Sequence, residues 1–362
     1  NVMFHKIYGL LLRFKKGFFQ FMDKKVTIYD IATAAGVSPA TVSRMIHQPN
    51  IVTKTTREKI LEAFSDYGIR PEDLAIKKTA AKSAKTSADA GSRAVLVCIP
   101  IWENPFYDDI LAGIENHLKQ HHYHMIITRE IPQRSTIFSF INYCSNLNIA
   151  GLVIMYAIAE DLLRQLKSAF PIVQCSEYNP LYRPVPYVSI DDYAITKAAI
   201  AYLIKTGCKR IGFFSAPFDY RYVQDRYRAY KSTLLSNGLS VDPDYIIQVS
   251  GYSYKHLLES AYRLFRLPKL PDAVFATSDI HAHAMINAAQ RSGIRVPEEL
   301  KVFGFDNTNY ATLSTPTIST IEQPRLALGV QSAELLLKMI AQPSAVFEPV
   351  LLPTKIILRE ST

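Results

Sequence analysis

The stretch VTIYDIATAAGVSPATVSRMIH, residues 26–47, decides how the amino-terminal part of this 362-residue chain folds. Gly36 is a typical turn residue, Ser38 is a preferred helix N-cap, and Pro39 suits the first position of a helix. Apolar residues at helical spacing lie on both sides of this turn, and small alanines before it allow two helices to approach closely. The stretch therefore predicts a helix, a tight turn and a second helix, with a third helix beginning at Thr55.

The second of these helices, expected at residues 39–46, carries the side chains that a DNA-binding protein needs. In a helix-turn-helix, the second helix enters the major groove, and its first residues reach base edges or phosphates. Arg44 is the candidate for base readout, because a guanidinium can donate two hydrogen bonds to guanine. Ser38, Thr41 and Ser43 suit contacts with phosphates. Each of these hydroxyl residues, taken alone, is also explained as an ordinary helix cap.

Positive charge is concentrated in the same part of the chain. Residues 1–94 contain 16 Lys and Arg against 8 Asp and Glu, whereas residues 95–362 contain 25 against 24. Basic side chains that neutralise DNA phosphates release counterions, and this release supplies much of the sequence-independent affinity for DNA. The distribution fits an amino-terminal DNA-binding module, while a solvated basic arm is the alternative that composition alone leaves open.

The remainder of the chain alternates apolar strand-like runs with amphipathic helical stretches, after a linker rich in Ala, Ser, Thr and Lys at residues 75–93. This alternation predicts parallel sheets covered by helices on both faces, and its two consecutive series imply two lobes. The expected strands lie at 94–99, 125–128, 151–155, 172–175, 187–191, 210–215, 245–249, 273–277, 301–305, 317–321 and 355–358. The expected helices lie at 107–121, 194–206, 227–237, 254–266, 281–292 and 326–340.

Several classes of protein are disfavoured by what the sequence lacks. The four cysteines are widely spaced, without a C-x-x-C pair, and are expected to be buried thiols of a cytoplasmic protein. The apolar run within residues 1–21 is too short, and the segment is too basic, to span a membrane. We expect these residues to lie upstream of a natural start at Met22. The histidines at 121, 122 and 124 are explained better by a solvated helix end than by a metal site. Phosphate-binding loops and hydrolase motifs do not occur, so we expect no catalytic residue, cofactor or metal.

Residues 26–47, together with TREKILEAFSDYGIRP at 56–71, resemble the DNA-binding headpiece of the lactose/galactose repressor family. The resemblance continues through NPFYDDILAGIE at 104–115, GCKRIGFFS at 207–215 and GIRVPEELKVFGFDN at 293–307. It implies a small all-α helix-turn-helix headpiece followed by an α/β core of two Rossmann-like lobes, similar to type I periplasmic binding proteins.

The same resemblance implies the domain boundaries. We expect an unstructured extension at 1–22, the headpiece at 23–72, a hinge or linker at 73–93 and the core at 94–362. Lobe 1 of the core is expected at about 94–189 and 322–348, and lobe 2 at about 190–321 and 349–360.

Carried onto this sequence, the resemblance implies DNA contacts spread over the headpiece. The matching positions are Thr27, Tyr29, Ser38, Ser43, Arg44, His47 and Thr56. Pro39, Ala40 and Thr41 complete the expected DNA-binding surface because they open the second helix.

The hinge departs from the family pattern. An Asn usually follows the Pro, and a Leu further on is inserted into the minor groove as a wedge. Here Glu72 follows Pro71, and Lys77 and Lys78 stand where the wedge is expected. A lysine cannot pry base steps apart equally well, so we expect less DNA kinking and more phosphate contacts from this segment.

A ligand is expected in a cleft between the lobes, where strand ends meet. The resemblance implies contacts at Phe106, Arg226, Tyr252 and Asp279, in which Arg and Asp would bind vicinal hydroxyls and the aromatic rings would pack on a sugar. Three further candidates are Asn104, which follows the first strand, and the less certain Tyr222 and Trp102. The alternative for Arg226 and Asp279 is an ion pair that fixes the lobe.

Together these features predict a sequence-specific transcriptional regulator. The resemblance implies that it is a repressor of carbohydrate metabolism genes. Its expected partners are double-stranded operator DNA, a sugar or sugar derivative as allosteric effector, and a second copy of the chain in a homodimer or tetramer, without a membrane. A soluble sugar-binding module and an α/β enzyme with its site in the cleft are the competing hypotheses.

Overall fold

The computed structural model describes residues 28–47, 52–67, 93–101, 104–249 and 253–362. The chain divides into two compact units, residues 1–90 and 91–362. No helix within these described ranges is long and apolar enough to cross a lipid bilayer.

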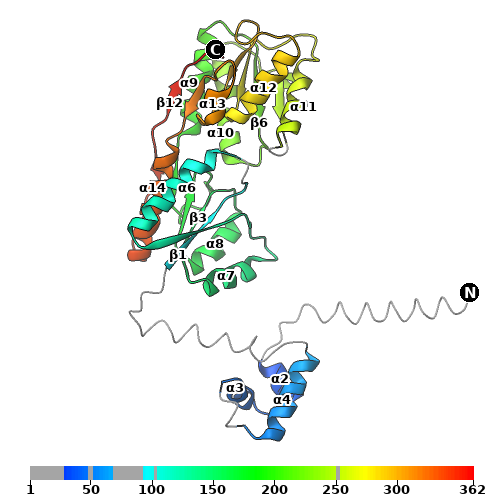
Figure 1. The fold of residues 1–362 in the computed structure, drawn as a ribbon, viewed down its shortest axis with the longest axis vertical. Coiled ribbons are helices and arrows are strands. Elements are labelled where there is room, and N and C mark those ends of the chain that lie inside the picture. Colours follow the sequence, from blue (N-terminus) through cyan, green and yellow to red (C-terminus); the bar gives the residue numbers. More distant parts are fainter. Residues whose placement is uncertain (1–27, 48–51, 68–92, 102–103, 250–252) are drawn as a thin grey trace, which may run out of the picture. The chain divides into compact units, whose positions relative to one another are not determined.

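The described residues of the first unit form three short helices around a small apolar core (Figure 1). They are α2 (Ile28–Ala34), α3 (Pro39–His47) and α4 (Lys54–Asp66). The turn between α2 and α3 has Gly36 at φ 63°, and the backbone N–H of Thr41 donates to the Ser38 hydroxyl at 3.2 Å. The predicted helix-turn-helix is confirmed, including the cap and the Pro at the first position of the second helix.

The third helix begins earlier than the sequence predicts. Thr53 is the residue that precedes α4, and its hydroxyl donates to the Thr56 hydroxyl at 2.8 Å. Thr55 therefore lies inside the helix and does not cap it.

The second unit begins with a lobe built on a six-stranded sheet in which every pair of neighbouring strands is parallel. Its order is β11 (Val350–Leu351), β5 (Tyr187–Ser189), β4 (Ile172–Cys175), β3 (Ile149–Ile154), β1 (Arg93–Cys98) and β2 (Tyr123–Thr128). Alternate strand residues face opposite layers, as the two-residue period of a strand requires. One face packs on α6 (Phe106–Gln120) and α14 (Arg325–Ala341), and the other on α7 (Ile137–Asn146) and α8 (Glu160–Ala169).

The other lobe has a four-stranded parallel sheet in the order β7 (Ile246–Gln248), β6 (Ile211–Ser215), β8 (Ala273–Ala276) and β9 (Lys301–Phe303). Helices α9 (Asp192–Lys205) and α10 (Arg221–Ser236) cover one face. Helices α11 (Tyr254–Leu264) and α12 (Asp279–Arg291) cover the other. The short elements are η3 (Pro243–Tyr245), α13 (Asn309–Leu313) and an antiparallel pair of β10 (Thr320–Glu322) with β12 (Lys355–Ile357).

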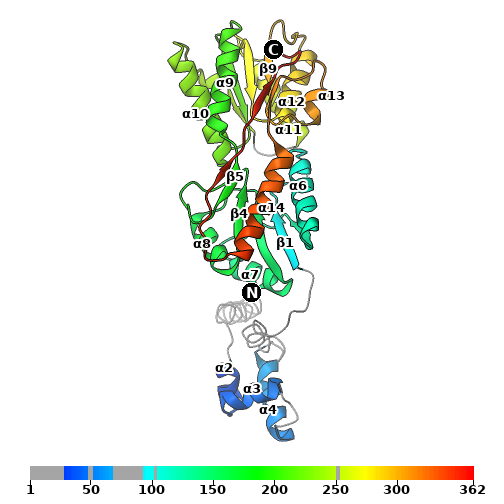
Figure 2. The same ribbon diagram turned by 90° about the vertical axis from the view of Figure 1, so that its left-hand side faces the viewer.

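Both lobes therefore have the predicted α/β organisation, and the chain passes between them three times. The crossings follow β5, β10 and β11, and Figure 2 shows α14 beside α6 in the first lobe and the carboxy-terminal segment, in dark red, returning to the other lobe. Because all strands within each main sheet are parallel, their carboxyl ends gather at one edge of each lobe.

Candidate functional site

In the first unit, the residues predicted to contact DNA lie on or beside the helix-turn-helix. Arg44 on α3 is exposed, and the Ser38 and Thr41 hydroxyls lie 2.8 Å apart at the start of that helix. Pro39, Ala40, Ser43 and His47 also belong to α3, Tyr29 belongs to α2, and Thr56 lies in the first turn of α4. Thr27 lies outside the described residues. The exposed guanidinium is suited to donating hydrogen bonds to a base, and the hydroxyl groups at the start of the helix are suited to binding the adjacent phosphates.

In the second unit, a small cleft of about 30 Å³ lies between the lobes. Its lining residues come from loops that follow the carboxyl ends of strands in both lobes, and from the starts of α6 and α10. They are Asn104, Phe106, Tyr107, Met155, Ser176, Glu177, Tyr220, Tyr222, Arg226, Thr277, Ser278, Asp306 and Gln323. The predicted residues Asn104, Phe106, Tyr222 and Arg226 are thus brought together, whereas Trp102 and Tyr252 lie outside the described residues.

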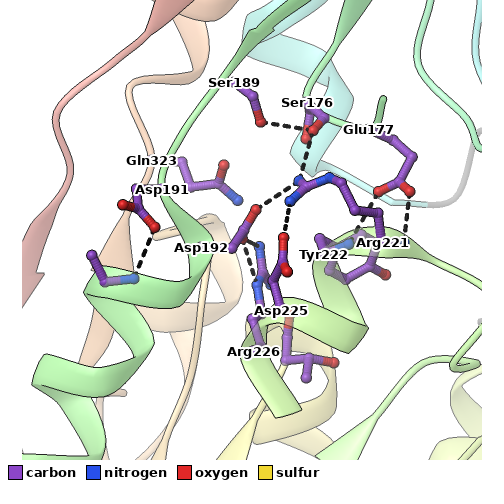
Figure 3. A network of polar contacts seen from close by, with 12 residues as sticks. Ser176, Glu177, Ser189, Asp191, Asp192, Arg221, Tyr222, Asp225, Arg226 and Gln323 are labelled. Carbon is purple, nitrogen blue, oxygen red and sulfur yellow. Dashed lines mark hydrogen bonds and ion pairs between the residues drawn. The ribbon is translucent and has the colours of Figure 1, made fainter. Parts of the chain in front are cut away.

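Arg226 is the centre of a buried polar network (Figure 3). Its Nε and Nη2 both donate to Asp192 Oδ1, at 2.8 and 2.7 Å, and its Nη1 donates to the Thr277 carbonyl at 2.6 Å. The guanidinium lies over the Phe305 ring, 3.3 Å from its centroid, and 4.7 Å from that of Tyr222. Arg226 therefore pairs with Asp192, and the alternative of an ion pair between Arg226 and Asp279 is not the arrangement observed.

Asp279 lies behind the wall of the cleft, fully buried. Its carboxylate accepts hydrogen bonds from the Thr308 N–H and hydroxyl, at 2.6 and 3.1 Å, and from the Thr320 hydroxyl at 2.6 Å. Burial raises the pKa of Asp279 to about 6, although the hydrogen bonds from Thr308 and Thr320 act to lower it. The preceding residue, Ser278, lines the cleft in its place.

The acidic side chain that does face the cleft from this lobe is Asp306. Gln323 Nε2 donates to its Oδ1 at 2.7 Å, and Gln323 Oε1 has no hydrogen-bond partner among the described residues. Burial raises the Asp306 pKa to about 8, although Arg226 opposes the shift. Its backbone has φ 106°, and such strained conformations of non-glycine residues concentrate at functional sites. Asp306 and Gln323 were not predicted as site residues, yet Asp306 in GFDN directly follows a predicted strand, a position that the strand-end rule could have selected.

A second acid, Glu177, reaches the start of α10 from the other lobe. Its carboxylate accepts hydrogen bonds from the backbone N–H groups of Arg221, at 2.7 Å, and Tyr222, at 3.3 Å. Arg221 also donates to the Ser176 carbonyl at 3.2 Å, pairs with Asp192 at 2.8 Å and contacts Asp225. Burial raises the Glu177 pKa to about 7, against the lowering effect of Arg221. The two lobes are thus linked by a carboxylate that caps a helix across the cleft (Figure 3).

The lining of the cleft also includes four aromatic side chains, those of Phe106, Tyr107, Tyr220 and Tyr222. Phe106 is buried at the start of α6, where its N–H donates to the Asn104 side chain at 3.0 Å. Tyr220 and Tyr222 lie with ring centroids 5.5 Å apart. Aromatic faces beside a few fixed polar groups are the composition of a small-molecule site.

Comparison with known proteins gives two family matches and many similar chains. Residues 27–72 match the model described as bacterial regulatory proteins, lacI family, and residues 200–362 match a periplasmic binding protein-like domain. The HTH-type transcriptional repressor CytR of Escherichia coli (strain K12) is 30% identical over 94% of this chain and 97% of its own length. Catabolite control protein A of Priestia megaterium is 31% identical over 93% and 99%.

Two solved structures span both units of the chain. A complex of the transcriptional regulator CelR with cellobiose is 25% identical, with a TM-score of 0.68, and covers 93% of this chain and 100% of that one. The lac repressor dimer bound to operator and an anti-inducer is 22% identical, with a TM-score of 0.67, over 93% and 99%, and it supports the fold.

Proposed function

Because the chain belongs to the lacI family of bacterial regulatory proteins and is therefore a DNA-binding transcriptional regulator, we propose that a small polyhydroxylated ligand in the interlobe cleft controls how tightly its headpiece holds an operator. The observation that carries the proposal is the group formed by Arg226, Asp306 and Gln323, a fixed set of hydrogen-bonding side chains beside aromatic rings. Such a group can bind hydroxyls with its polar atoms while the rings pack on the apolar face of a sugar. Among the relatives, CelR is seen with cellobiose, which supports a sugar as the class of ligand.

On the DNA side, Arg44 reads a guanine in the major groove, and the remaining predicted contacts position the headpiece on the phosphates. Those contacts are Thr27, Tyr29, Ser38, Pro39, Ala40, Thr41, Ser43, His47 and Thr56. The headpiece extends over 23–72, and the linker at 73–93 joins it to the core at 94–362. Lys77 and Lys78 of the linker add phosphate contacts in place of a minor-groove wedge.

On the ligand side, Asn104, Phe106, Tyr222, Arg226 and Tyr252 contact the effector, and Ser278, Asp306 and Gln323 join them. All of these but Tyr252, which lies outside the described residues, line the cleft. Asp279 acts indirectly. Its carboxylate accepts a hydrogen bond from the Thr308 N–H and so fixes the segment that follows Asp306. Since the present cleft holds about 30 Å³, the lobes or the aromatic side chains must move to admit a sugar.

The protein acts as a homodimer in the cytoplasm and represses genes of carbohydrate metabolism without catalysing a reaction. Two headpieces then read two halves of a near-palindromic site. The names of the relatives, transcriptional repressor and transcriptional regulator, support the regulatory part of this proposal.

The DNA-binding proposal is tested by selecting bound fragments from genomic DNA and comparing wild type with Arg44→Ala in gel-shift titrations. We expect the variant to lose about 1–3 kcal/mol at the selected site and much less on unrelated DNA, because a lost base contact affects specific binding. Arg57→Ala, which removes an exposed charge from α4 of the same unit, is the matched control and should weaken both kinds of binding similarly. Failure to recover any preferred fragment would contradict the function itself.

A further inference from the structure

Two adjoining hollows of about 680 and 510 Å³ lie in the lobe built on the six-stranded sheet, and neither shares a lining residue with the cleft. Their walls include the loop at 176–186, which follows β4, and the segment at 342–349, which joins α14 to β11. The second hollow continues between the carboxyl ends of α8 and α14 (Figure 2). Arg183 borders both hollows, and we call the two together the Arg183 groove. Small-molecule sites commonly measure about 300–1,000 Å³, so each hollow has room for a ligand.

The surface of the groove is aromatic and rich in proline. Its aromatic members are Tyr178, Tyr182, Tyr187 and Phe347, and its prolines are at 180, 184, 186, 343 and 349. The rings of Tyr178 and Tyr187 lie parallel, with their centroids 3.6 Å apart. Aromatic and proline side chains have few rotatable bonds, so a planar ring can pack on them without ordering long side chains. This composition is suited to a ligand with an aromatic ring.

The groove also has a guanidinium that the protein leaves without a counter-charge. Arg183 is exposed, and within the described part of the chain its side chain makes no hydrogen bond or ion pair. Lys167, in the last turn of α8, borders the second hollow and pairs with no described acidic residue. Glu348 borders the first hollow but does not pair with Arg183. Because a guanidinium binds a carboxylate through two parallel hydrogen bonds, Arg183 is complementary to an acidic group on a ligand.

One wall of the groove contacts the other lobe through the ring of Tyr178. Tyr187 covers one face of this ring, so the Arg221 guanidinium, 4.1 Å from the ring centroid, lies over the opposite face. Arg221 begins α10 in the other lobe, and it donates to the Ser176 carbonyl at 3.2 Å. Strands β5 and β11 directly follow the two groove segments and lead into crossings between the lobes. A ligand that orders these segments is therefore placed to change the contacts that join the lobes.

We propose that the Arg183 groove is a second ligand site, separate from the cleft, which binds an aromatic carboxylate. The carboxylate is bound by Arg183, with Lys167 adding positive potential, and the aromatic ring packs on the tyrosines. Glu348 favours a hydroxyl or amino donor on the ring, away from the acid. Binding depends on the groove alone, whereas an effect on operator affinity, through Tyr178 and Arg221, rests on the function proposed above.

The test is isothermal titration calorimetry of the full chain with aromatic acids and their amides. The acids are para-hydroxybenzoate, para-hydroxyphenylacetate and indoleacetate, and octanoate supplies the same acidic group on an aliphatic chain. We expect at least one aromatic acid to bind, and its amide to bind about tenfold more weakly, because an uncharged amide cannot form the ion pair with Arg183. Octanoate should bind more weakly than that acid, since an aliphatic chain cannot stack on a tyrosine ring.

Variants locate the site. Arg183→Gln removes the charge at similar length and should weaken the acid by about tenfold while leaving its amide unchanged. The melting temperature should stay the same, because the Arg183 side chain has no partner among the residues that the structure describes. Arg266→Gln removes an exposed charge just beyond α11 and is the matched control, with acid affinity unchanged. Gln323→Met, a change in the cleft, should also leave acid affinity unchanged.

Several results would overturn the proposal. An acid that binds no better than its amide, or equally well to Arg183→Gln, contradicts the ion pair, and octanoate binding more tightly than every aromatic acid contradicts the aromatic ring. Loss of acid binding in Gln323→Met would move the site to the cleft. Absence of binding by every acid contradicts the site itself. If Arg183→Gln then also sediments more slowly than wild type, the groove is a contact between copies of the chain.

Gel-shift titration of the operator with the bound acid tests the coupling separately. We expect the acid to change operator affinity in the wild type and to have no effect, at the same concentration, on Arg183→Gln. An unchanged operator affinity in the wild type contradicts the regulatory role of the groove and leaves the site standing. Because the calorimetry uses no DNA, failure of the site and failure of the proposed function are distinguishable.

Discussion

Among single residues, Arg226 combines a structural role with a place in the cleft. It is 4% exposed, and its guanidinium compensates the buried carboxylate of Asp192. Removing one partner of a buried ion pair leaves the other uncompensated, at a cost of about 3–5 kcal/mol. A substitution at Arg226 therefore reports on folding as much as on ligand binding, and the ligand contact is better tested elsewhere.

Gln323 is a cleft residue at which ligand binding can be tested without removing a charge. Its Oε1 has no partner among the described residues, whereas its Nε2 donates to Asp306. We expect Gln323→Met to weaken binding of the effector by about tenfold, through loss of a hydrogen bond of about 1–2 kcal/mol, and to lower the melting temperature because Asp306 loses its donor. Gln165→Met on α8, away from the cleft, is the matched control and should leave ligand affinity unchanged in the same calorimetric titration. A tenfold loss in the control, or none at Gln323, would remove Gln323 from the ligand site.

Glu177 gives the stability of the protein a defined dependence on pH. Burial raises its pKa from 4.5 to about 7, so between these values the native chain holds a proton that the unfolded chain releases. The contribution of this group is then fully favourable below pH 4.5 and is lost as the pH rises through about 7. Glu177→Gln cannot ionise, so its stability relative to wild type should increase from pH 5 to pH 8, approaching about 3 kcal/mol.

Urea unfolding of the full chain at several pH values measures this difference. Glu360→Gln is a control of opposite sign, since hydrogen bonds from Thr317 lower the Glu360 pKa, and its relative stability should decline slightly as the pH rises. A Glu177→Gln difference that stays constant between pH 5 and pH 8 would contradict the burial effect.

At the scale of elements, the buried strands were the most predictable part of the chain. The runs at 172–175 and 273–277 correspond to β4 and β8 within one residue, because strands covered on both faces are continuously apolar. Helices α7 and α8 were not among the predicted helices, although both are present. Their short amphipathic patterns lie between strands. Thr136 precedes α7 and Ala159 precedes α8, but neither helix start has a side-chain cap hydrogen bond.

The beginning of α10 shows what the sequence could not reveal. A helix is predicted from residue 227, whereas α10 begins at Arg221. Its first N–H groups are satisfied by Glu177, a residue 44 positions earlier in the chain. The same long-range organisation places Ser278 and Asp306 in the cleft and Asp279 behind it, because position after a strand does not fix which of two adjacent side chains faces the ligand. Of the candidate site, the sequence predicted the strand-end location and four of the lining residues: Asn104, Phe106, Tyr222 and Arg226.

Helices α6 and α14 pack closely enough that glycine is needed where they cross (Figure 2). A Cβ atom at Gly329 would lie 2.1 Å from the Ile110 carbonyl oxygen, and one at Gly113 would lie 2.3 Å from that of Leu326. Alanine ordinarily favours a helix over glycine by about 1 kcal/mol, so the sign of its effect is diagnostic here. We expect Gly329→Ala to lower the free energy of unfolding by about 2 kcal/mol or more, through forced separation of the two helices.

Chemical denaturation measures this loss, and an exposed position on the same helix provides the comparison. Ala327→Gly should cost about 1 kcal/mol from propensity alone. If Gly329→Ala instead stabilised the protein, the close crossing of α6 and α14 would be refuted.

At the scale of the whole molecule, charge and ligand chemistry are divided between the two parts of the chain. The excess of Lys and Arg lies almost entirely within residues 1–94, whereas the cleft lies in the second unit and has Arg226 as the one Lys or Arg among its described lining residues. Operator affinity should therefore fall steeply with salt concentration, while affinity for an uncharged effector should change little. Salt can thus be used to vary one binding reaction without the other.

Control of DNA binding by the cleft requires that the two reactions be coupled in both directions. If the effector changes operator affinity by some factor, the operator must change effector affinity by the same factor, and such factors are commonly about 5 to 150.

Arg325, which bonds the Pro105 and Asn307 carbonyls from the two lobes, is placed to transmit lobe movement. We expect Arg325→Ala to bring this coupling factor closer to one, by the same amount for operator affinity and for effector affinity. The measurement is a pair of titrations at one salt concentration, operator with and without effector and effector with and without operator. A factor of one in the wild type would show that the ligand does not regulate this headpiece, and unequal factors for the variant would mean that one titration is reporting a different binding site.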